Sequence, residues 1–226
     1  MNILLFSRGY PSINDLQWGC FEKDQAIALQ KLGHKVVFIS IDGRFRFQKI
    51  GISHKKDQEF DIYNFYLFPF KFLRLFGINF FLRVLQWMVL KLFFKVKKEF
   101  TPDVIYAHYL PNIYSSSIIK EKTGIPIVGI EHWSKLNQDT LEPFVKEMGK
   151  TAYKSVDCLV SVSESLRQRI KNHFGYDSIV IHNMVGLDFD LKQIQNKNMK
   201  GNYPLNILTT TAKRKRFSDT TGLRTL

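Results

Sequence analysis

The sequence predicts an α/β fold, a Rossmann-like parallel sheet flanked by helices. Two unbroken apolar runs, at residues 3–6 and 36–39, lie on either side of a segment with helical periodicity, so the chain opens as strand, loop, helix, strand. Strands without polar alternation are typical of parallel sheets that are buried on both faces. The loop after the first strand therefore opens at the carboxyl ends of the strands, where such sheets bind ligands.

The first helix is predicted from about Phe21 to Leu32, and Gly33 supplies the left-handed residue that ends it. Its spacing predicts an inward face of Phe21, Ala26, Leu29 and Leu32, and an outward face of Glu22, Lys23, Gln30 and Lys31. Gly19, at the helix start, would let a phosphate approach the free backbone N–H groups. Gly9 and Gly19 do not form the G-x-G-x-x-G fingerprint, so plain turn geometry is the alternative.

Composition and charge indicate which classes of molecule the protein could bind. The 226 residues are 45% hydrophobic, which suffices for one large domain or two small ones, and the net charge is +13. This charge predicts an anionic partner: a membrane surface, nucleotide phosphates or nucleic acid. Nucleic acid is the least favoured, because the basic cluster Lys213–Arg216 would neutralise phosphates without reading bases.

The cysteines and the N-terminus indicate a cytoplasmic protein. The two cysteines, Cys20 and Cys158, form neither a C-x-x-C pair nor a disulfide ladder, so a reducing compartment fits. Cys158 lies in an apolar run and is expected to be a buried strand residue. The chain enters its first strand directly, with no signal-peptide pattern.

A second helix is predicted within residues 70–100, after a strand at 60–68. Lys91 and Arg83 interrupt its apolar stretch, and each would cost about 2.5–3.5 kcal/mol at a bilayer centre, so a membrane span is disfavoured. An apolar stripe for the sheet consists of Leu82, Leu85, Val89, Leu92 and Val96. The opposite face consists of Arg83, Trp87, Lys91, Phe94, Lys95 and Lys98. This cationic and aromatic face suits an anionic lipid surface. The alternative is a core helix whose outer face is merely charged.

Two later strands end in candidate site residues. Residues 102–108 predict a turn and a buried strand that ends in His108, and residues 127–130 predict a strand followed by Glu131, His132 and Trp133. Histidines at such positions are also common as structural residues. Further on, the sequence predicts a helix at 114–122, a long helix at 136–154 broken early by Pro143, a strand at 156–162, a helix capped by Ser163 and a strand at 179–182.

Several segments together resemble family 4 glycosyltransferases of the GT-B architecture. They are Gly9-Tyr10-Pro11, Gly19-Cys20-Phe21-Glu22, Leu32-Gly33-His34-Lys35-Val36, Pro102 to His108, Ile130-Glu131-His132-Trp133, Asp157 to Leu166 and Ile181-His182-Asn183. The likeness is collinear from Met1 to about Leu208. It departs from the family at Met184, where the family has the glycine of an Asn-Gly-Val turn.

The resemblance implies a retaining hexosyltransferase that moves a sugar from a nucleotide sugar to a glycan or lipid-linked acceptor in surface polysaccharide biosynthesis. It implies no cofactor and no metal. It gives an acceptor-side domain at residues 1–190, a linker at 191–204, and the first strand of a second domain with a basic tail at 205–226. The chain would then lack the donor-binding domain and be inactive alone. The alternative is a non-catalytic fragment that binds the acceptor or a membrane surface, peripheral at the inner face of the membrane.

The resemblance also assigns roles to single residues. His132 would be catalytic, placed against the transferred sugar. Gly19, His108 and Glu131 would bind the substrate or the donor phosphate. No general base for the acceptor is identified.

Overall fold

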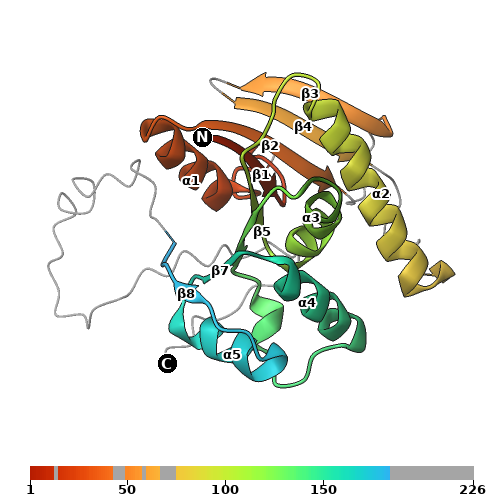
Figure 1. Ribbon diagram of the computed structural model, residues 1–226, viewed down its shortest axis with the longest axis vertical. Helices are drawn as coiled ribbons and strands as arrows, with labels where there is room; N and C mark the ends of the chain where they lie inside the picture. The colour runs from red at the N-terminus through yellow and green to blue at the C-terminus, as the bar shows by residue number, and fades with distance from the viewer. Residues whose placement is uncertain (13–14, 43–48, 58–59, 67–74, 184–226) are drawn as a thin grey trace, which may run out of the picture. The chain divides into compact units, whose positions relative to one another are not determined.

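The computed structural model describes residues 1–12, 15–42, 49–57, 60–66 and 75–183, which belong to one compact unit. Its centre is an eight-stranded sheet of order β3-β4-β2-β1-β5-β6-β7-β8 (Figure 1). The strands are β1 (Asn2–Ser7), β2 (Lys35–Asp42), β3 (Gly51–Asp57), β4 (Phe60–Tyr66), β5 (Val104–His108), β6 (Ile127–Glu131), β7 (Cys158–Ser161) and β8 (Ile179–Val180). Only the β3–β4 pair is antiparallel, which confirms the predicted Rossmann-like parallel sheet.

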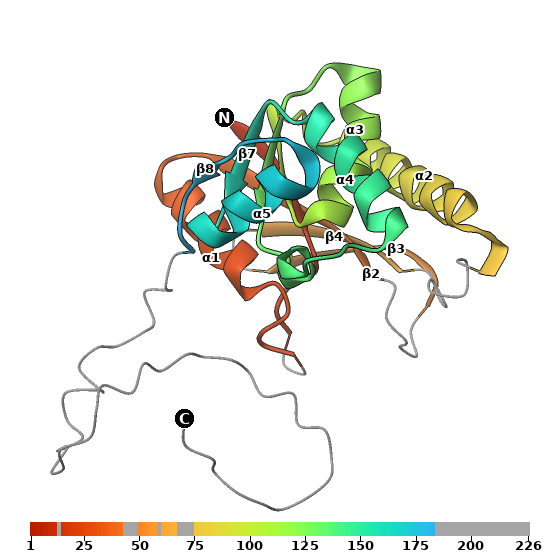
Figure 2. The ribbon, with the colours of Figure 1, turned by 90° about the horizontal axis from the view of Figure 1, so that it is seen from below.

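Helices cover both faces of this sheet (Figures 1 and 2). They are α1 (Cys20–Lys31), α2 (Ile78–Val96), α3 (Leu110–Thr123), α4 (Pro143–Ser155) and α5 (Glu164–Phe174), with a short 3-10 helix, η2 (Ser134–Asn137). Leu4 and Phe6 of β1 belong to the core shared with α2, α3 and α4. The alternate residues Ile3 and Leu5 belong to a second core with Ala26 of α1. Because successive side chains of β1 point to opposite faces of the sheet, this strand contributes residues to both cores.

The strand order reverses direction at β1. The chain leaves β1 through α1 to β2 on one side, and returns later to β5 on the other, so β2 and β5 both pair with β1 in parallel. In such sheets the crevice outside the carboxyl ends of the two central strands is the usual ligand site. Residues 8–12 and 15–19, together with the residues after β5 and β6, lie at this edge.

The predicted faces of α1 are wrong at Phe21, Glu22 and Leu32, whereas Ala26 is buried and Leu29 packs against the core, as predicted. Glu22 is fully buried, whereas Phe21 and Leu32 are 39% and 74% exposed. Glu22 turns inward because its Oε1 accepts a hydrogen bond from the backbone N–H of Arg8, at 3.3 Å. The first turn of α1 therefore packs against the loop that follows β1, and a polar contact takes the place that the periodicity assigned to apolar residues.

The predicted stripe of α2 is confirmed. Leu85, Val89, Leu92 and Val96 are buried against the sheet, and Leu82 is partly buried. Met88 and Phe93 are buried beside them. The helix therefore packs through a broad apolar face and presents its cationic face to solvent.

Other boundaries differ from the predicted ones. Pro143 starts α4 instead of breaking a longer helix, because proline fits the first turn, where no backbone N–H is needed. The Ser163 hydroxyl caps α5, as predicted, by accepting from the N–H of Leu166. The polar edge strand β3 was not predicted, and Cys158 is only partly buried. The turn at Met184, the linker, the strand at 205–209 and the basic tail lie outside the described residues.

Candidate active site

A pocket of about 240 Å³ opens at the carboxyl edge of the sheet. It is lined by Arg8, Trp18, Ile41, Tyr109, Pro111, Asn112 and Trp133. These residues follow or end β1, β2, β5 and β6, or begin α3, so the pocket lies at the reversal of strand order. The structure thus forms a pocket where the topology predicts a ligand.

The two candidate histidines are brought together beside this pocket. His108 Nδ1 lies 3.3 Å from His132 Nε2, and the Tyr109 ring stacks on His132 with centroids 3.7 Å apart. Burial lowers the pKa of His108 well below its usual value, and the adjacent His132 adds to this. Burial, and then the positive charge of Arg8, lower the pKa of His132 to about 3. Both imidazoles are therefore neutral near pH 7, and an N–H of one donates a hydrogen bond to the ring nitrogen of the other.

Glu131 is held inside the fold. Its Oε1 accepts from the N–H of Trp133 at 2.9 Å, and its Oε2 accepts from the hydroxyl of Tyr153 at 2.8 Å. Complete burial outweighs these hydrogen bonds and raises the pKa of Glu131 to about 7. One carboxyl oxygen therefore holds the turn that carries His132 and the other is anchored to α4, while the assigned role in substrate binding stays a prediction.

Arg8 supplies the positive charge of the pocket, and sequence reasoning missed it. Its guanidinium carbon lies 4.6 Å from the ring centroid of Trp18 and 4.8 Å from that of Tyr109. Cation–π contacts on two rings hold the cation in place. The available signal was position, because Arg8 directly follows the first strand.

Tyr109 has a strained backbone. It is the non-glycine residue with positive φ (68°) among the described residues, and it connects β5 to α3. Such conformations cost about 1–3 kcal/mol and cluster at functional sites. The Tyr109 ring contacts both His132 and Arg8.

Gly19 has a packing reason to be glycine. Its φ is 83°, and a Cβ atom there would lie 2.2 Å from the carbonyl oxygen of Gly9. The loop 8–19 thus closes on itself at the start of α1, and Phe21 of α1 contacts the His132 ring at 6.5 Å between centroids. The structure therefore brings the glycine loop next to His132, while the phosphate-binding role of Gly19 stays a prediction.

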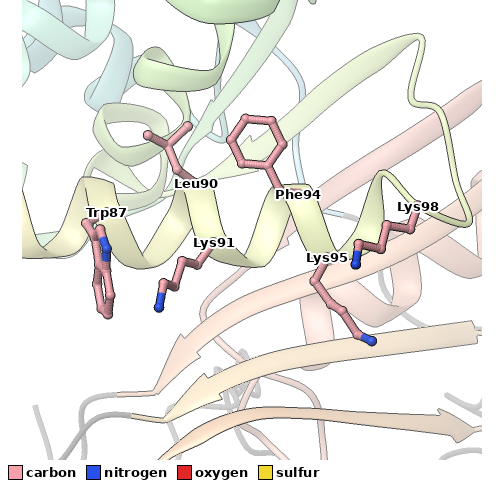
Figure 3. A pocket seen from close by; sticks show the side chains of 6 residues that line it. All are labelled: Trp87, Leu90, Lys91, Phe94, Lys95 and Lys98. Atoms are coloured by element: carbon pink, nitrogen blue, oxygen red, sulfur yellow. The ribbon is translucent and has the colours of Figure 1, made fainter.

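The predicted membrane face lies apart from this pocket, along α2. Figure 3 shows Leu90 and Phe94 pointing one way from the helix, and Trp87, Lys91 and Lys95 pointing the other. They line a hollow of about 440 Å³ together with Lys98, and Arg83 is exposed nearby on the same helix. Trp87 is 49% exposed, with its ring between Phe65 at 5.9 Å and the Lys91 ammonium at 4.4 Å.

Two further observations concern the described part of the chain. None of its helices combines the length and apolar character needed to cross a bilayer. It also contains no group of three His, Cys, Asp or Glu side chains placed to hold a metal ion.

Comparison with known proteins identifies the fold and the family. The model of "Glycosyltransferase Family 4" matches residues 23–189. A sucrose-phosphate synthase structure from Thermosynechococcus elongatus matches with a TM-score of 0.56 and 10% identity, over 86% of this chain and 94% of that one. An α,α-trehalose-phosphate synthase from Burkholderia xenovorans, in complex with glucose-6-phosphate, has a TM-score of 0.57 and 13% identity, over 76% and 43%.

The Anabaena protein HepE, in complex with UDP and glucose, matches with a TM-score of 0.54 and 14% identity, over 82% of this chain and 45% of that one. The chain therefore spans less than half the length of both HepE and the Burkholderia enzyme. At these identities the structures show the fold. The sequence matches no curated protein.

Proposed function

The chain belongs to glycosyltransferase family 4, and from this premise we propose that it transfers a sugar from a nucleotide-sugar donor to a glycan or lipid-linked acceptor in surface polysaccharide biosynthesis. The observation that carries the proposal is the neutral pair His108–His132 beside an arginine-lined pocket at the reversal of strand order. HepE, which shares the fold, was solved with UDP and glucose, and this agrees with a nucleotide-sugar donor.

The proposed roles follow from charge and position. Arg8 binds a phosphate that enters the pocket, because a guanidinium suits phosphate geometry and this one is already oriented by two rings. The loop of Gly19, at the positive end of α1, lies near the donor diphosphate. The nucleoside diphosphate leaves with the electrons of its bond to the anomeric carbon, while the acceptor hydroxyl forms the new bond and passes its proton to the departing diphosphate oxygen.

His132 is the catalytic residue in this proposal. Because its pKa is low, the imidazole is neutral and can exchange hydrogen bonds with a hydroxyl of the transferred sugar. His108 and Glu131 are positioning residues: His108 contacts His132 directly, and Glu131 fixes the backbone that follows it.

A second part of the proposal concerns the membrane. The α2 face of Arg83, Trp87, Lys91, Phe94, Lys95 and Lys98 would dock on an anionic leaflet and bring a lipid-linked acceptor within reach. If the chain had no transferase activity of its own, the same face would serve a membrane-surface or acceptor-binding domain. The two functions differ in whether a donor is turned over.

The test is an assay with UDP-, GDP- and ADP-linked sugars, with and without lipid extract, of the purified chain alone and of the chain joined to a donor-binding domain of the same family. We expect no sustained turnover from the chain alone, and in the joined protein a release of nucleoside diphosphate that falls about 10²-fold or more in His132→Ala. His34→Ala is the matched control, because His34 lies at the amino end of the sheet beside Met1. Unchanged turnover in a folded His132→Ala protein would reject the catalytic role. Donor-independent binding of lipid or glycan, without turnover, would favour the non-catalytic function.

A further inference from the structure

A row of polar residues crosses four neighbouring strands on the face that α1 covers. The register aligns Ser7 with Ser40, Ser40 with Asn64, and Asn64 with Ser53. Two residues earlier, on the same face, the positions in β1, β2 and β4 are apolar: they are Leu5, Phe38 and Ile62 of the second core. On this face, the side chains therefore change from apolar to polar toward the carboxyl edge of the sheet.

Part of this row is buried. Ser7 and Ser40 are 1% and 4% exposed. The Ser40 hydroxyl donates to Asn64 Oδ1 at 2.9 Å, while the Ser7 hydroxyl has no hydrogen-bond partner among the described residues. Ser40 and Asn64 satisfy each other, so Ser7 is the one buried side chain of the row whose hydroxyl lacks a partner among the described residues, and such a group is unfavourable for folding.

A pocket of about 220 Å³ opens over Ser40, Asn64 and Ser53 of this row, and Ser7 is not part of its lining. Its polar lining is Ser12, Ser40, Asp42, Ser53, Lys55 and Asn64, and its other walls are Gly9, Tyr10, Trp18 and Ile62. Trp18 lines both this pocket and the one that contains Arg8. The two pockets are therefore neighbours that share one aromatic wall.

The chemistry of the lining selects a class of ligand. One carboxylate, Asp42, and one ammonium, Lys55, oppose each other in charge, so the pocket has no excess positive charge for a phosphate. Hydroxyls and an amide can both donate and accept, as a ring with several hydroxyl groups requires. Tyr10 and Trp18 can pack against the C–H face of such a ring. The volume is below the roughly 300–1,000 Å³ of pockets for drug-sized ligands.

We propose that this pocket binds a single neutral sugar ring of the acceptor, next to the pocket in which transfer occurs. The proposal rests on the proposed glycosyltransferase function, because it names the acceptor as the source of the sugar. Trp18 then separates an uncharged acceptor sugar from the phosphate of the donor. The polar side chains of this pocket thus recognise the acceptor sugar by the arrangement of its hydroxyl groups.

The test measures direct binding without turnover. Methyl glycosides of glucose, galactose, mannose and N-acetylglucosamine are added to the whole chain, and saturation-transfer NMR reports which sugars bind. Ser53→Trp fills the pocket from an exposed position on the edge strand β3, so the fold is not at risk. Lys56→Trp is the matched control. Lys56 is exposed on the same strand, but its side chain lies on the opposite face from that of Ser53, because side chains alternate along a strand.

We expect at least one glycoside to bind, with affinity at least tenfold weaker in Ser53→Trp and unchanged in Lys56→Trp. Asn64→Leu should weaken the binding of the same glycoside, because it removes the amide group of the polar row. Failure of all four glycosides to bind, or equal binding to Ser53→Trp, would overturn the proposal. Binding of UDP-, GDP- or ADP-sugars is measured in parallel. A donor that binds and turns over while no glycoside binds would sink this inference and leave the proposed function intact.

Discussion

At the scale of single residues, the charge of Arg8 determines two properties of the site. Its guanidinium lies over Trp18 and Tyr109, and it also lowers the pKa of His132. If Arg8 binds phosphate, its replacement should weaken ligand binding, whereas a residue that only packs could be replaced without a change in ligand affinity. The His132 titration reports the charge itself.

We expect Arg8→Met to weaken binding of a nucleotide sugar by about tenfold or more, since a hydrogen bond to a charged group contributes about 1.5–3 kcal/mol. The same change should raise the pKa of His132, measured by NMR titration of its imidazole. Arg169→Met is the control, because Arg169 is on α5 and pairs with Asp139. Unaltered donor affinity together with an unaltered His132 titration would remove Arg8 from the site.

Residue-level prediction worked where a side chain ends a strand. His108 and His132 follow apolar runs, so their meeting at one sheet edge could be inferred from the sequence. The contacts of Arg8 with Trp18 and Tyr109 depend on how the loop 8–19 folds back, and on an unusual φ at Tyr109. Neither has a periodic signal, because loop conformation is set by local packing.

At the scale of elements, the start of α1 needs a glycine at position 19 for two reasons: the positive φ and the lack of space for a Cβ atom. Gly19 and Gly33 both have φ of 83°, where a Cβ costs about 1–2 kcal/mol, but Gly33 has open space around it. Gly19→Ala should therefore lower the free energy of unfolding by at least about 1 kcal/mol more than Gly33→Ala, because its Cβ meets Gly9. Denaturant unfolding measures both variants. Equal losses would show that the loop accommodates the methyl group.

The outer face of α2 gives a second prediction for an element. Lys91 and Lys95 should each contribute about 1 kcal/mol to binding an anionic surface, so replacing both with Glu should abolish sedimentation with anionic liposomes at moderate salt. Lys146→Glu with Lys154→Glu changes the net charge equally on exposed positions of α4. If both double variants lose binding alike, net charge explains the effect. If neither does, α2 is an ordinary charged helix.

Periodicity predicted α2 well and α1 poorly, for one physical reason. The long α2 packs on the sheet through an apolar stripe, which is what a hydrophobic period reports. The first turn of α1 packs on a loop, where the backbone N–H of Arg8 needs an acceptor that Glu22 supplies. The polar strand β3 had no hydrophobic period, because an edge strand buries little of its surface.

At the scale of the whole molecule, the sequence was sufficient for the parallel sheet and for the edge that carries the site. Apolar runs predict buried strands, and strand–helix–strand order predicts parallel pairing. The order of the outer strands was not available, because β4 and β8 occupy their places through pairing that no local pattern encodes. The polar row across β1, β2, β4 and β3 was hidden for the same reason.

The stability of the whole molecule should depend on pH through groups of opposite sign. Glu131 has a folded-state pKa of about 7 against a usual 4.5, so its contribution to stability is present at low pH and is lost as pH rises between these values. His132 has a folded-state pKa of about 3 against 6.5, and that of His108 is also lowered. Their contributions are present above pH 6.5 and are lost as pH falls.

Between pH 4.5 and 6.5 two histidines therefore oppose one carboxyl, and from these groups stability should rise with pH. Glu131→Gln keeps an acceptor for the Trp133 N–H but removes the opposing group, so the rise should steepen by up to about 1.4 kcal/mol per pH unit. Urea unfolding at several pH values across this window measures the slope, and Glu147→Gln, at an exposed position of α4, is the control. A slope in Glu131→Gln equal to that of the parent protein would mean that Glu131 is ionised in the folded state. The carboxylate would then carry a buried negative charge next to His132, and the raised pKa of Glu131 would have to be given up.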